Sequence, residues 1–273
     1  MKLHVIGVHL VGATLLFSSC ISSADQTHSA QETATDNAKN GQSIEITGVR
    51  NPEWKPYRTL LLGFDAFERH RELAPKAALR FSVRSLNPAT SIDGVTMSLE
   101  SRAHSIPLQL DQNSSFSLPL DQAAVDDGAE LLINRKKNTI TIRPDIRTPG
   151  LPANMRRLGD LRLECHVRWA IQRDELSFVK RNAFRMLGGP CASGTVKTFY
   201  IADRMISGAW ITLPGRKVPL EVIGNGTLFR PPLHETAWSD EALIELEFDN
   251  EIRSPDKGED ASLAESKHEN ANR

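Results

Sequence analysis

The sequence predicts a mainly β protein: two related small antiparallel β-sandwich units, with a short N-terminal helix and an α/β insert between them. One reason is a series of short segments in which apolar and polar residues alternate, separated by turn residues such as Asn113-Ser114 and Gly224-Asn225-Gly226. This spacing is typical of antiparallel sheets that pack face to face. The other reason is a match of the chain with itself.

The match aligns residues 116–134 with residues 229–247 without a gap. Six aligned pairs are identical, where average composition predicts about one. The pairs are Phe116/Phe229, Pro119/Pro232, Leu120/Leu233, Ala124/Ala237, Asp127/Asp240 and Ala129/Ala242. Upstream, 106–110 matches 218–222, 113–115 matches 225–227 after one inserted residue, and 96–99 matches 210–213. We therefore expect two copies of one unit.

Each copy is expected to consist of strands. In the first copy they lie at 79–83, 95–99, 131–133 and 139–142, and in the second at 196–201, 209–213, 218–222 and 242–248. Residues 52–75 carry apolar side chains near helical spacing after Pro56, which favours a helix that packs on a sheet. In the insert, 161–169 alternates like a strand and 176–187 has helical spacing, ended by Gly188-Gly189-Pro190.

The two copies resemble the transthyretin-like or carboxypeptidase-regulatory-like β-sandwich. The resemblance lies in a hairpin, then Phe-x-x-Pro-Leu, then an Ala/Asp segment leading into an apolar strand, and it covers about 77–143 and 194–248. It implies a small, non-catalytic sandwich of the kind found in surface and secreted proteins.

The N-terminus is expected to be an export signal. Lys2 supplies a positive start, residues 5–17 form an apolar run, and small residues precede Cys20. This pattern resembles the lipobox of bacterial lipoproteins, with Phe17 where Leu is commoner. An ordinary cleaved signal peptide and an uncleaved anchor are the alternatives. The resemblance implies acylation of Cys20, a membrane anchor in the cell envelope, and sorting to the outer membrane because Ile21 rather than Asp follows the cysteine.

These observations divide the chain into six expected parts. They are a lipoprotein signal peptide (1–20), a disordered tether (21–42), a first sandwich unit with its N-terminal helix (43–149), a disulfide-pinned insert (150–193), a second sandwich unit (194–248) and a disordered tail (249–273).

Two cysteines remain once Cys20 is assigned to lipid. In an oxidising periplasm Cys165 and Cys191 are expected to form a disulfide, which closes a loop of about 26 residues and contributes about 3 kcal/mol. Two free buried thiols are the first alternative, and a metal-binding or catalytic cysteine is the second.

No catalytic signature stands out, and no cofactor or metal ion is expected. Residues 188–195 look like a phosphate loop but lack its Lys. Two neighbouring acids occur at an equivalent place in each copy, Asp126-Asp127 in the first and Asp240-Glu241 in the second. Paired carboxylates can bind Ca²⁺ or act as acid and base. Before a strand, however, they more often cap a turn, and we expect that role here.

Positive charge is concentrated in the middle of the chain. Residues 135–185 hold thirteen Lys or Arg and five Asp or Glu, although the whole chain has a net charge of −1. The densest points are Arg135, Lys136, Lys137, Arg156 and Arg157, which we take as candidate contacts to an anionic partner. That partner could be lipopolysaccharide phosphate, a phospholipid headgroup or an acidic envelope protein, but not nucleic acid. The alternative is a solvated face partly paired with the acidic tail.

Trp210 is the other candidate binding residue. In the internal alignment it matches Thr96, so strand alternation places it on the outer face if Met97 and Leu99 point inward. There it could stack on a ligand, or pack against a second element. Trp238, which matches Val125, is expected in the core.

The sequence as a whole favours a non-enzymatic, lipid-anchored binding or structural module of the cell envelope. The first alternative is an envelope enzyme, or an enzyme accessory, that acts on glycan or peptide. A subunit of a larger envelope complex is the second.

Overall fold

The computed structural model describes residues 49–86 and 90–249. This part is mainly β, with several antiparallel sheets and few helices, as the sequence predicted. The expected signal peptide, the tether, Cys20 and nearly all of the expected tail lie outside the described residues. Among the residues described, no helix has the length and apolar character needed to cross a membrane.

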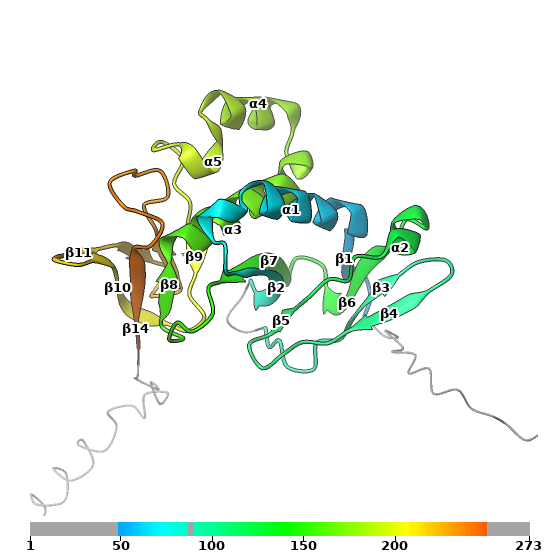
Figure 1. The fold of residues 1–273 in the computed structure, drawn as a ribbon. Coiled ribbons are helices and arrows are strands. Elements are labelled where there is room, and N and C mark those ends of the chain that lie inside the picture. The colour runs from blue at the N-terminus through cyan, green and yellow to red at the C-terminus, as the bar shows by residue number, and fades with distance from the viewer. Residues whose placement is uncertain (1–48, 87–89, 250–273) are drawn as a thin grey trace, which may run out of the picture. The chain divides into compact units, whose positions relative to one another are not determined.

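The first half of the described chain begins with a strand and a helix (Figure 1). Its elements are β1 (Pro52–Pro56), α1 (Tyr57–Arg69), η1 (Arg71–Leu73), β2 (Ala78–Ser85), β3 (Met97–Glu100), β4 (Ser105–Leu108), β5 (Ser115–Phe116), α2 (Gln122–Asp126), β6 (Glu130–Lys136) and β7 (Ile140–Arg147). The helix expected after Pro56 is confirmed.

The second half also begins with a strand followed by a helix. Its elements are β8 (Met155–Arg157), α3 (Leu158–Gln172), η2 (Arg173–Glu175), α4 (Phe178–Met186), α5 (Gly189–Ala192), β9 (Tyr200–Ile201), β10 (Ile206–Leu213), β11 (Arg216–Pro219), β12 (Glu221–Ile223), β13 (Leu228–Arg230) and β14 (Leu243–Phe248). The helix expected at 176–187 is confirmed as α4.

Each half contains a four-stranded and a three-stranded sheet. In the first half the strand orders are β1-β6-β3-β4 and β5-β2-β7, and in the second half they are β11-β10-β14-β8 and β12-β13-β9. All neighbouring strands in these four sheets are antiparallel.

The two halves pair their strands in the same register. Leu99 lies opposite Ile106 and Leu131 in the first half. Ile211 lies opposite Val218 and Ile244 in the second. The smaller sheets also correspond, with an aromatic pair in each. Phe81 faces Phe116 with ring centroids 5.8 Å apart, and Tyr200 faces Phe229 at 6.0 Å.

The correspondence extends to the strand and helix that open each half. The backbone N–H of Tyr57, the first residue of α1, donates to the carbonyl of Ala129 at 2.9 Å. The N–H of Leu158, the first residue of α3, donates to the carbonyl of Ala242 at 2.8 Å. Ala129 and Ala242 are an identical pair in the internal alignment. Each bond therefore ties the start of a helix to the last strand of its four-stranded sheet.

The strand expected at 161–169 is wrong, because this segment is the middle of α3. One side of α3 buries Leu163, Val167 and Ile171 in the hydrophobic cluster of the first half. The other side buries Leu161 and Cys165 in the cluster of the second half. A surface helix is recognised in a sequence by apolar residues on one side only. Because α3 is apolar on two opposite sides, its apolar and polar residues alternate as in a strand, and the sequence-based prediction was misled.

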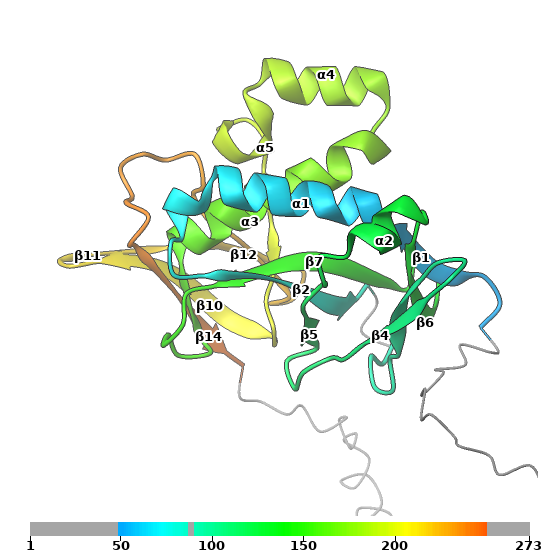
Figure 2. The ribbon, with the colours of Figure 1, turned by 45° about the vertical axis from the view of Figure 1, so that its right-hand side comes forward.

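Helices α1 and α3 lie side by side over β2 and β7 (Figures 1 and 2). Close approach depends on small residues in both helices. A Cβ atom on Gly63 would lie 2.8 Å from the side chain of Ile171, and one on Gly159 would lie 2.1 Å from the carbonyl oxygen of Leu73. The first hydrophobic cluster combines residues of α1 and α3 with those of the first-half sheets.

The expected disulfide is confirmed. Cys165 of α3 and Cys191 of α5 are bonded, with their Cα atoms 5.7 Å apart. The bond ties the segment after α4 to the helix that both clusters share, rather than to a strand.

Candidate ligand-binding site

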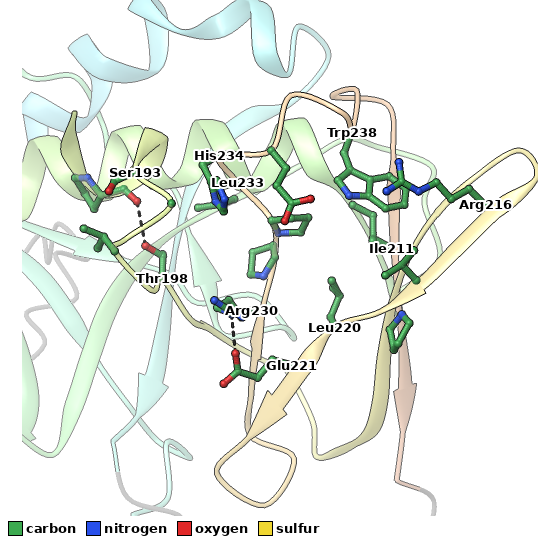
Figure 3. A pocket seen from close by; sticks show the side chains of 18 residues that line it. Ser193, Thr198, Ile211, Arg216, Leu220, Glu221, Arg230, Leu233, His234 and Trp238 are labelled. Carbon is green, nitrogen blue, oxygen red and sulfur yellow. Dashed lines mark hydrogen bonds and ion pairs between the residues drawn. The ribbon is translucent and has the colours of Figure 1, made fainter. Parts of the chain in front are cut away.

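A cleft of about 200 Å³ lies in the second half, and we call it the proline cleft (Figure 3). It is formed by β11, the start of β12, the end of β13, the loop 231–238 and the segment 190–198 that follows the disulfide. Its lining residues are Pro190, Ser193, Gly194, Val196, Thr198, Ile211, Arg216, Val218, Pro219, Leu220, Glu221, Arg230, Pro231, Pro232, Leu233, His234, Glu235 and Trp238.

Part of the lining is rigid. Four prolines contribute to it, and each has a fixed φ and no backbone N–H. Trp238 is only 2 % exposed, as expected for a core residue, and its ring lies under Arg216 with the guanidinium carbon 3.8 Å from the ring centroid (Figure 3). This cation–π contact holds a charged group at the edge of an apolar cleft.

The β12–β13 hairpin sets one end of the cleft. Its turn, Gly224-Asn225-Gly226, has positive φ throughout, which Gly and Asn tolerate. The hairpin register places Glu221 opposite Arg230, and the two side chains form an ion pair of 2.7 Å (Figure 3). The two side chains therefore neutralise each other's charge at the cleft.

The segment after the disulfide forms another wall. The Thr198 hydroxyl donates to the carbonyl of Pro190 at 3.2 Å, and the backbone N–H of Thr195 donates to the hydroxyl of Ser193 at 3.2 Å. A Cβ atom on Gly194 would lie 3.1 Å from the His234 ring, so the two segments touch at this point. These two hydrogen bonds and the Cys165–Cys191 disulfide hold this wall in place.

The hydroxyl groups at this cleft form local hydrogen bonds. Among the residues described, no hydrogen bond joins the His234 imidazole to Ser193, Thr195 or Thr198. The described part of the chain also has no group of three or more His, Cys, Asp or Glu placed to hold a metal ion. The cleft can take an apolar side chain and offer charged groups at its edge.

A larger cleft of about 760 Å³ lies where the halves meet, and we call it the arginine cleft. It is lined by β2, the turn 111–115, the end of β7, the loop 148–155 and residues 203–204. Asp203 accepts hydrogen bonds of 2.7 Å from both Arg84 and Arg147. Because Arg84 and Arg147 belong to the first half and Asp203 to the second, these ion pairs join the halves.

One acid of the arginine cleft, Asp145, is held in its charged form. Burial alone would raise the pKa of Asp145, but the positive charges of Arg147 and Arg156, with hydrogen bonds from Arg147 and Ser115, hold it below its ordinary value. The neighbouring carboxylates raise the pKa of Arg147 against the effect of its own burial. With its pKa lowered, the Asp145 carboxyl is ionised near neutral pH.

The predicted anion-contact residues are not brought together. Arg135 and Lys136 end β6, and Lys137 follows in the turn to β7. The Arg135 guanidinium donates to the backbone carbonyls of Asp93 and Asn134. The Lys137 ammonium lies 5.6 Å from the Trp54 ring centroid. Lys136 is exposed.

Arg156 and Arg157 lie in β8, in a different sheet, and both are buried. Arg156 donates to Glu164 at 2.8 Å. Arg157 donates to Glu241 at 2.9 Å and to the carbonyl of Leu73 at 2.7 Å. Both side chains are therefore buried and paired with acids of the chain itself, instead of presenting their charge to an anionic partner at the surface.

Trp210 is half-buried and lies on the opposite side of β10 from Ile211 and Ala209, which are buried. The alignment with Thr96 is wrong by two residues. In the sheets, the equivalent of Trp210 is Ser98. Trp210 lies opposite Pro219 and Glu245, and Ser98 lies opposite the corresponding residues Pro107 and Leu132. The ring closely contacts Gly208, and the Lys217 ammonium lies 5.0 Å from its centroid.

The recurring carboxylates do not share a site. Asp126 accepts from Gln122 at 2.8 Å, whereas Asp240 accepts from Arg162 at 2.6 Å and Glu241 accepts from Arg157. The cap of α2 is Asp121, which accepts from the N–H of Ala124 at 3.1 Å.

Sequence reasoning missed both clefts. The pair Pro231-Pro232 inside the second copy was the one available signal for the proline cleft, since it places two rigid residues beside a predicted core Trp. Nothing in the sequence indicated that Arg84 and Arg147 would meet Asp203. No protein-family model, curated protein or solved structure matches this chain.

Proposed function

We propose that this chain is a non-catalytic, lipid-anchored binding module of the bacterial cell envelope, which takes an apolar side chain of a peptide or protein into the proline cleft. The observation that carries the proposal is a preformed concave site in which four rigid prolines and several apolar side chains lie beside polar groups and an ion pair. Such sites bind through shape and burial, and a few polar groups set orientation.

The size of the cleft favours an anchor side chain over a whole small molecule. Its volume of about 200 Å³ is below the roughly 300–1,000 Å³ of typical small-molecule sites. A buried anchor surrounded by a polar rim is the usual arrangement at protein interfaces. Arg216, Glu221, Arg230 and Glu235 supply that rim here.

The envelope location is part of the proposal. It rests on the lipobox-like sequence that ends at Cys20, and the Cys165–Cys191 disulfide supports it, because disulfides persist in oxidising compartments. The partners proposed are the membrane, through the acylated cysteine, and an envelope protein. Sorting to the outer membrane is proposed from Ile21.

We also propose that the two halves are copies of one unit. The support is the shared register of four strand pairs and the equivalent bonds of Tyr57 and Leu158. The copies differ where the cleft lies. The first half has α2 after its β5 strand, whereas the second half has the loop 231–238, which lines the proline cleft.

This internal match supplies a control for the test. Val218 lines the cleft, and Ile106 occupies the same pairing position in the first half. The chain from Ile21 onward would be used to select binders from a displayed library of random peptides. We expect the selected peptides to bind the wild type and Ile106→Glu alike, and to lose at least about tenfold in affinity for Val218→Glu, because a buried unpaired charge is costly.

Equal binding to wild type and Val218→Glu, or a library from which nothing is selected, would contradict the proposal. The same peptides, and purified peptidoglycan, would be incubated with the protein and analysed by mass spectrometry. Turnover that one side-chain substitution abolishes would instead establish the enzyme alternative.

A further inference from the structure

Helix α4 exposes apolar side chains to water. Phe178, Val179 and Met186 are 69 %, 75 % and 88 % exposed, and Leu187, which follows the helix, is also exposed. No residue of α4 is buried. Large apolar side chains that gather on one exposed element mark a contact surface more often than isolated ones do.

The exposed apolar residues share one face of the helix. Each residue of an α-helix turns by about 100°, which places 178, 179 and 186 on one side and 184 on the opposite side. Phe184 packs on Trp169 of α3 with ring centroids 5.3 Å apart. Phe184 therefore attaches α4 to the body, and the other face points outward. Figures 1 and 2 show α4 beyond α1 and α3, on the side away from the sheets.

All charged residues in and just after α4 are positive. Residues 176–202 include Lys180, Arg181, Arg185 and Lys197 but no Asp or Glu. Arg181 donates to Asp174 at 3.1 Å. Among the ion pairs of the described residues, none involves Lys180 or Arg185. The helix with the outward apolar face thus carries two cations, Lys180 and Arg185, that have no acidic partner among the described residues.

We propose that α4 is a membrane-contact helix, whose apolar face inserts at the surface of a bilayer that contains anionic phospholipid. An apolar face beside Lys and Arg is the composition that binds such surfaces, because apolar burial and attraction to headgroups act together.

A helix of this length binds a membrane weakly by itself. Stable attachment of a peripheral protein usually takes two signals, one of which can be a basic patch. The inference deepens the proposed function and rests on it for the envelope location only. With an acylated Cys20, α4 would orient the body on the membrane as well as help to hold it there.

The test uses the chain from Ile21 onward, which contains every residue of both hydrophobic clusters and has no acyl group or export signal. Its binding is measured by co-sedimentation with vesicles of phosphatidylglycerol and phosphatidylcholine, and with vesicles of phosphatidylcholine alone. We expect binding to the anionic vesicles, and we expect added salt to weaken it. The apolar variant Phe178→Ser/Val179→Ser/Met186→Ser and the charge variant Lys180→Gln/Arg185→Gln should each bind at least about tenfold more weakly.

Each variant has a matched control outside α4. Leu120→Ser/Met205→Ser removes exposed apolar side chains, and Lys136→Gln/Lys137→Gln removes exposed positive charge at the β6–β7 turn. Both controls should bind as the wild type does. Circular dichroism and denaturant unfolding verify that every variant folds, which is expected because the substituted residues are exposed.

Three results would overturn the inference: equal binding to both kinds of vesicle, unchanged binding by both α4 variants, or equal losses in the α4 variants and their controls. None of them bears on peptide binding in the proline cleft, which is measured without a membrane. The two proposals can therefore fail separately.

Discussion

Arg156 donates a hydrogen bond of 2.8 Å to Glu164, and both side chains are buried. Arg156 belongs to β8 and Glu164 to α3, and the same guanidinium donates to the carbonyl of Ile146 in β7 at 3.1 Å. The pair therefore connects the first two elements of the second half to a strand of the first half. Burial raises the pKa of Glu164, and the Arg156 charge opposes that shift only in part.

Removing one member of this pair should destabilise the fold strongly. Glu164→Ala leaves a buried guanidinium without its acid, which costs about 3–5 kcal/mol of unfolding free energy. Urea unfolding monitored by circular dichroism would measure the loss. The control is Glu245→Ala, which breaks the exposed pair between Glu245 and Lys217 and should cost less than about 1 kcal/mol. Similar losses in the two variants would contradict a buried structural role.

Reduction of the Cys165–Cys191 disulfide should lower stability and loosen the proline cleft. The bond spans 26 residues, and a loop of that length gives about 3.5 kcal/mol by the loop-entropy estimate. Urea midpoints with and without a thiol reductant would measure this difference. Selected peptides should also bind the reduced protein more weakly, because Pro190 and Ser193 stand on either side of Cys191. In Cys165→Ala/Cys191→Ala, reductant should have no effect on either measurement.

The stability of the fold should decrease in acid because of His166. Its ring stacks on His70 with centroids 4.0 Å apart, and burial, followed by the charge of His70, lowers the pKa of His166 to about 4. The pKa of an unfolded histidine is about 6.5. Between these values the unfolded chain binds a proton that the folded chain does not. The stabilisation is therefore present above pH 6.5 and is lost as the pH falls through 4.

Substituting His166 should remove that part of the pH dependence. Between pH 7 and pH 4, His166→Gln should lose about 1 kcal/mol less unfolding free energy than the wild type, a figure already reduced for the partial exposure of the ring. Urea titrations at a series of pH values would give the slopes. His104→Gln, in the exposed turn between β3 and β4, is the control. If His166→Gln kept the wild-type slope, the titration of another group would have to explain it.

Two glycines in the packed helices should respond differently to alanine. In Gly159→Ala the new methyl group would lie 2.1 Å from the carbonyl oxygen of Leu73, so backbone must move, and we expect a loss of at least about 2 kcal/mol. In Gly63→Ala it meets the end of the Ile171 side chain, which can rotate, and alanine also favours a helix. That change should stay within about 1 kcal/mol. Thermal unfolding of the two variants would test the order.

The parts of the fold that sequence could predict are those with a local or repeated signal. The strands around Phe81 and Leu131, the helix after Pro56, helix α4 and the disulfide all follow from such signals. Helix α3 does not, because Leu161 and Val167 face different hydrophobic clusters. Apolar residues on opposite sides of one helix resemble strand alternation until the second core is known.

The candidate sites depended on partners far apart in the chain. A count of charges identified Arg156 and Arg157 as basic, but it could not reveal that Glu164 and Glu241 neutralise them in the fold. The count did include Lys180 and Arg185 of α4, which form no ion pair within the described part of the chain. Trp238 was predicted in the core from its match with Val125. The cleft above Trp238 forms only where segments 190–198 and 216–221 come together in the fold. The local order of apolar and polar residues does not predict that contact.

Helix α3 supplies apolar side chains to both hydrophobic clusters. A cut in the loop between β7 and β8 would separate the first half from Leu163, Val167 and Ile171, and leave those residues uncovered on the other fragment. Neither fragment could then be expected to remain soluble without the other. The described chain should therefore melt in one cooperative step, and a protease with access to that loop would inactivate the whole molecule rather than release two working pieces.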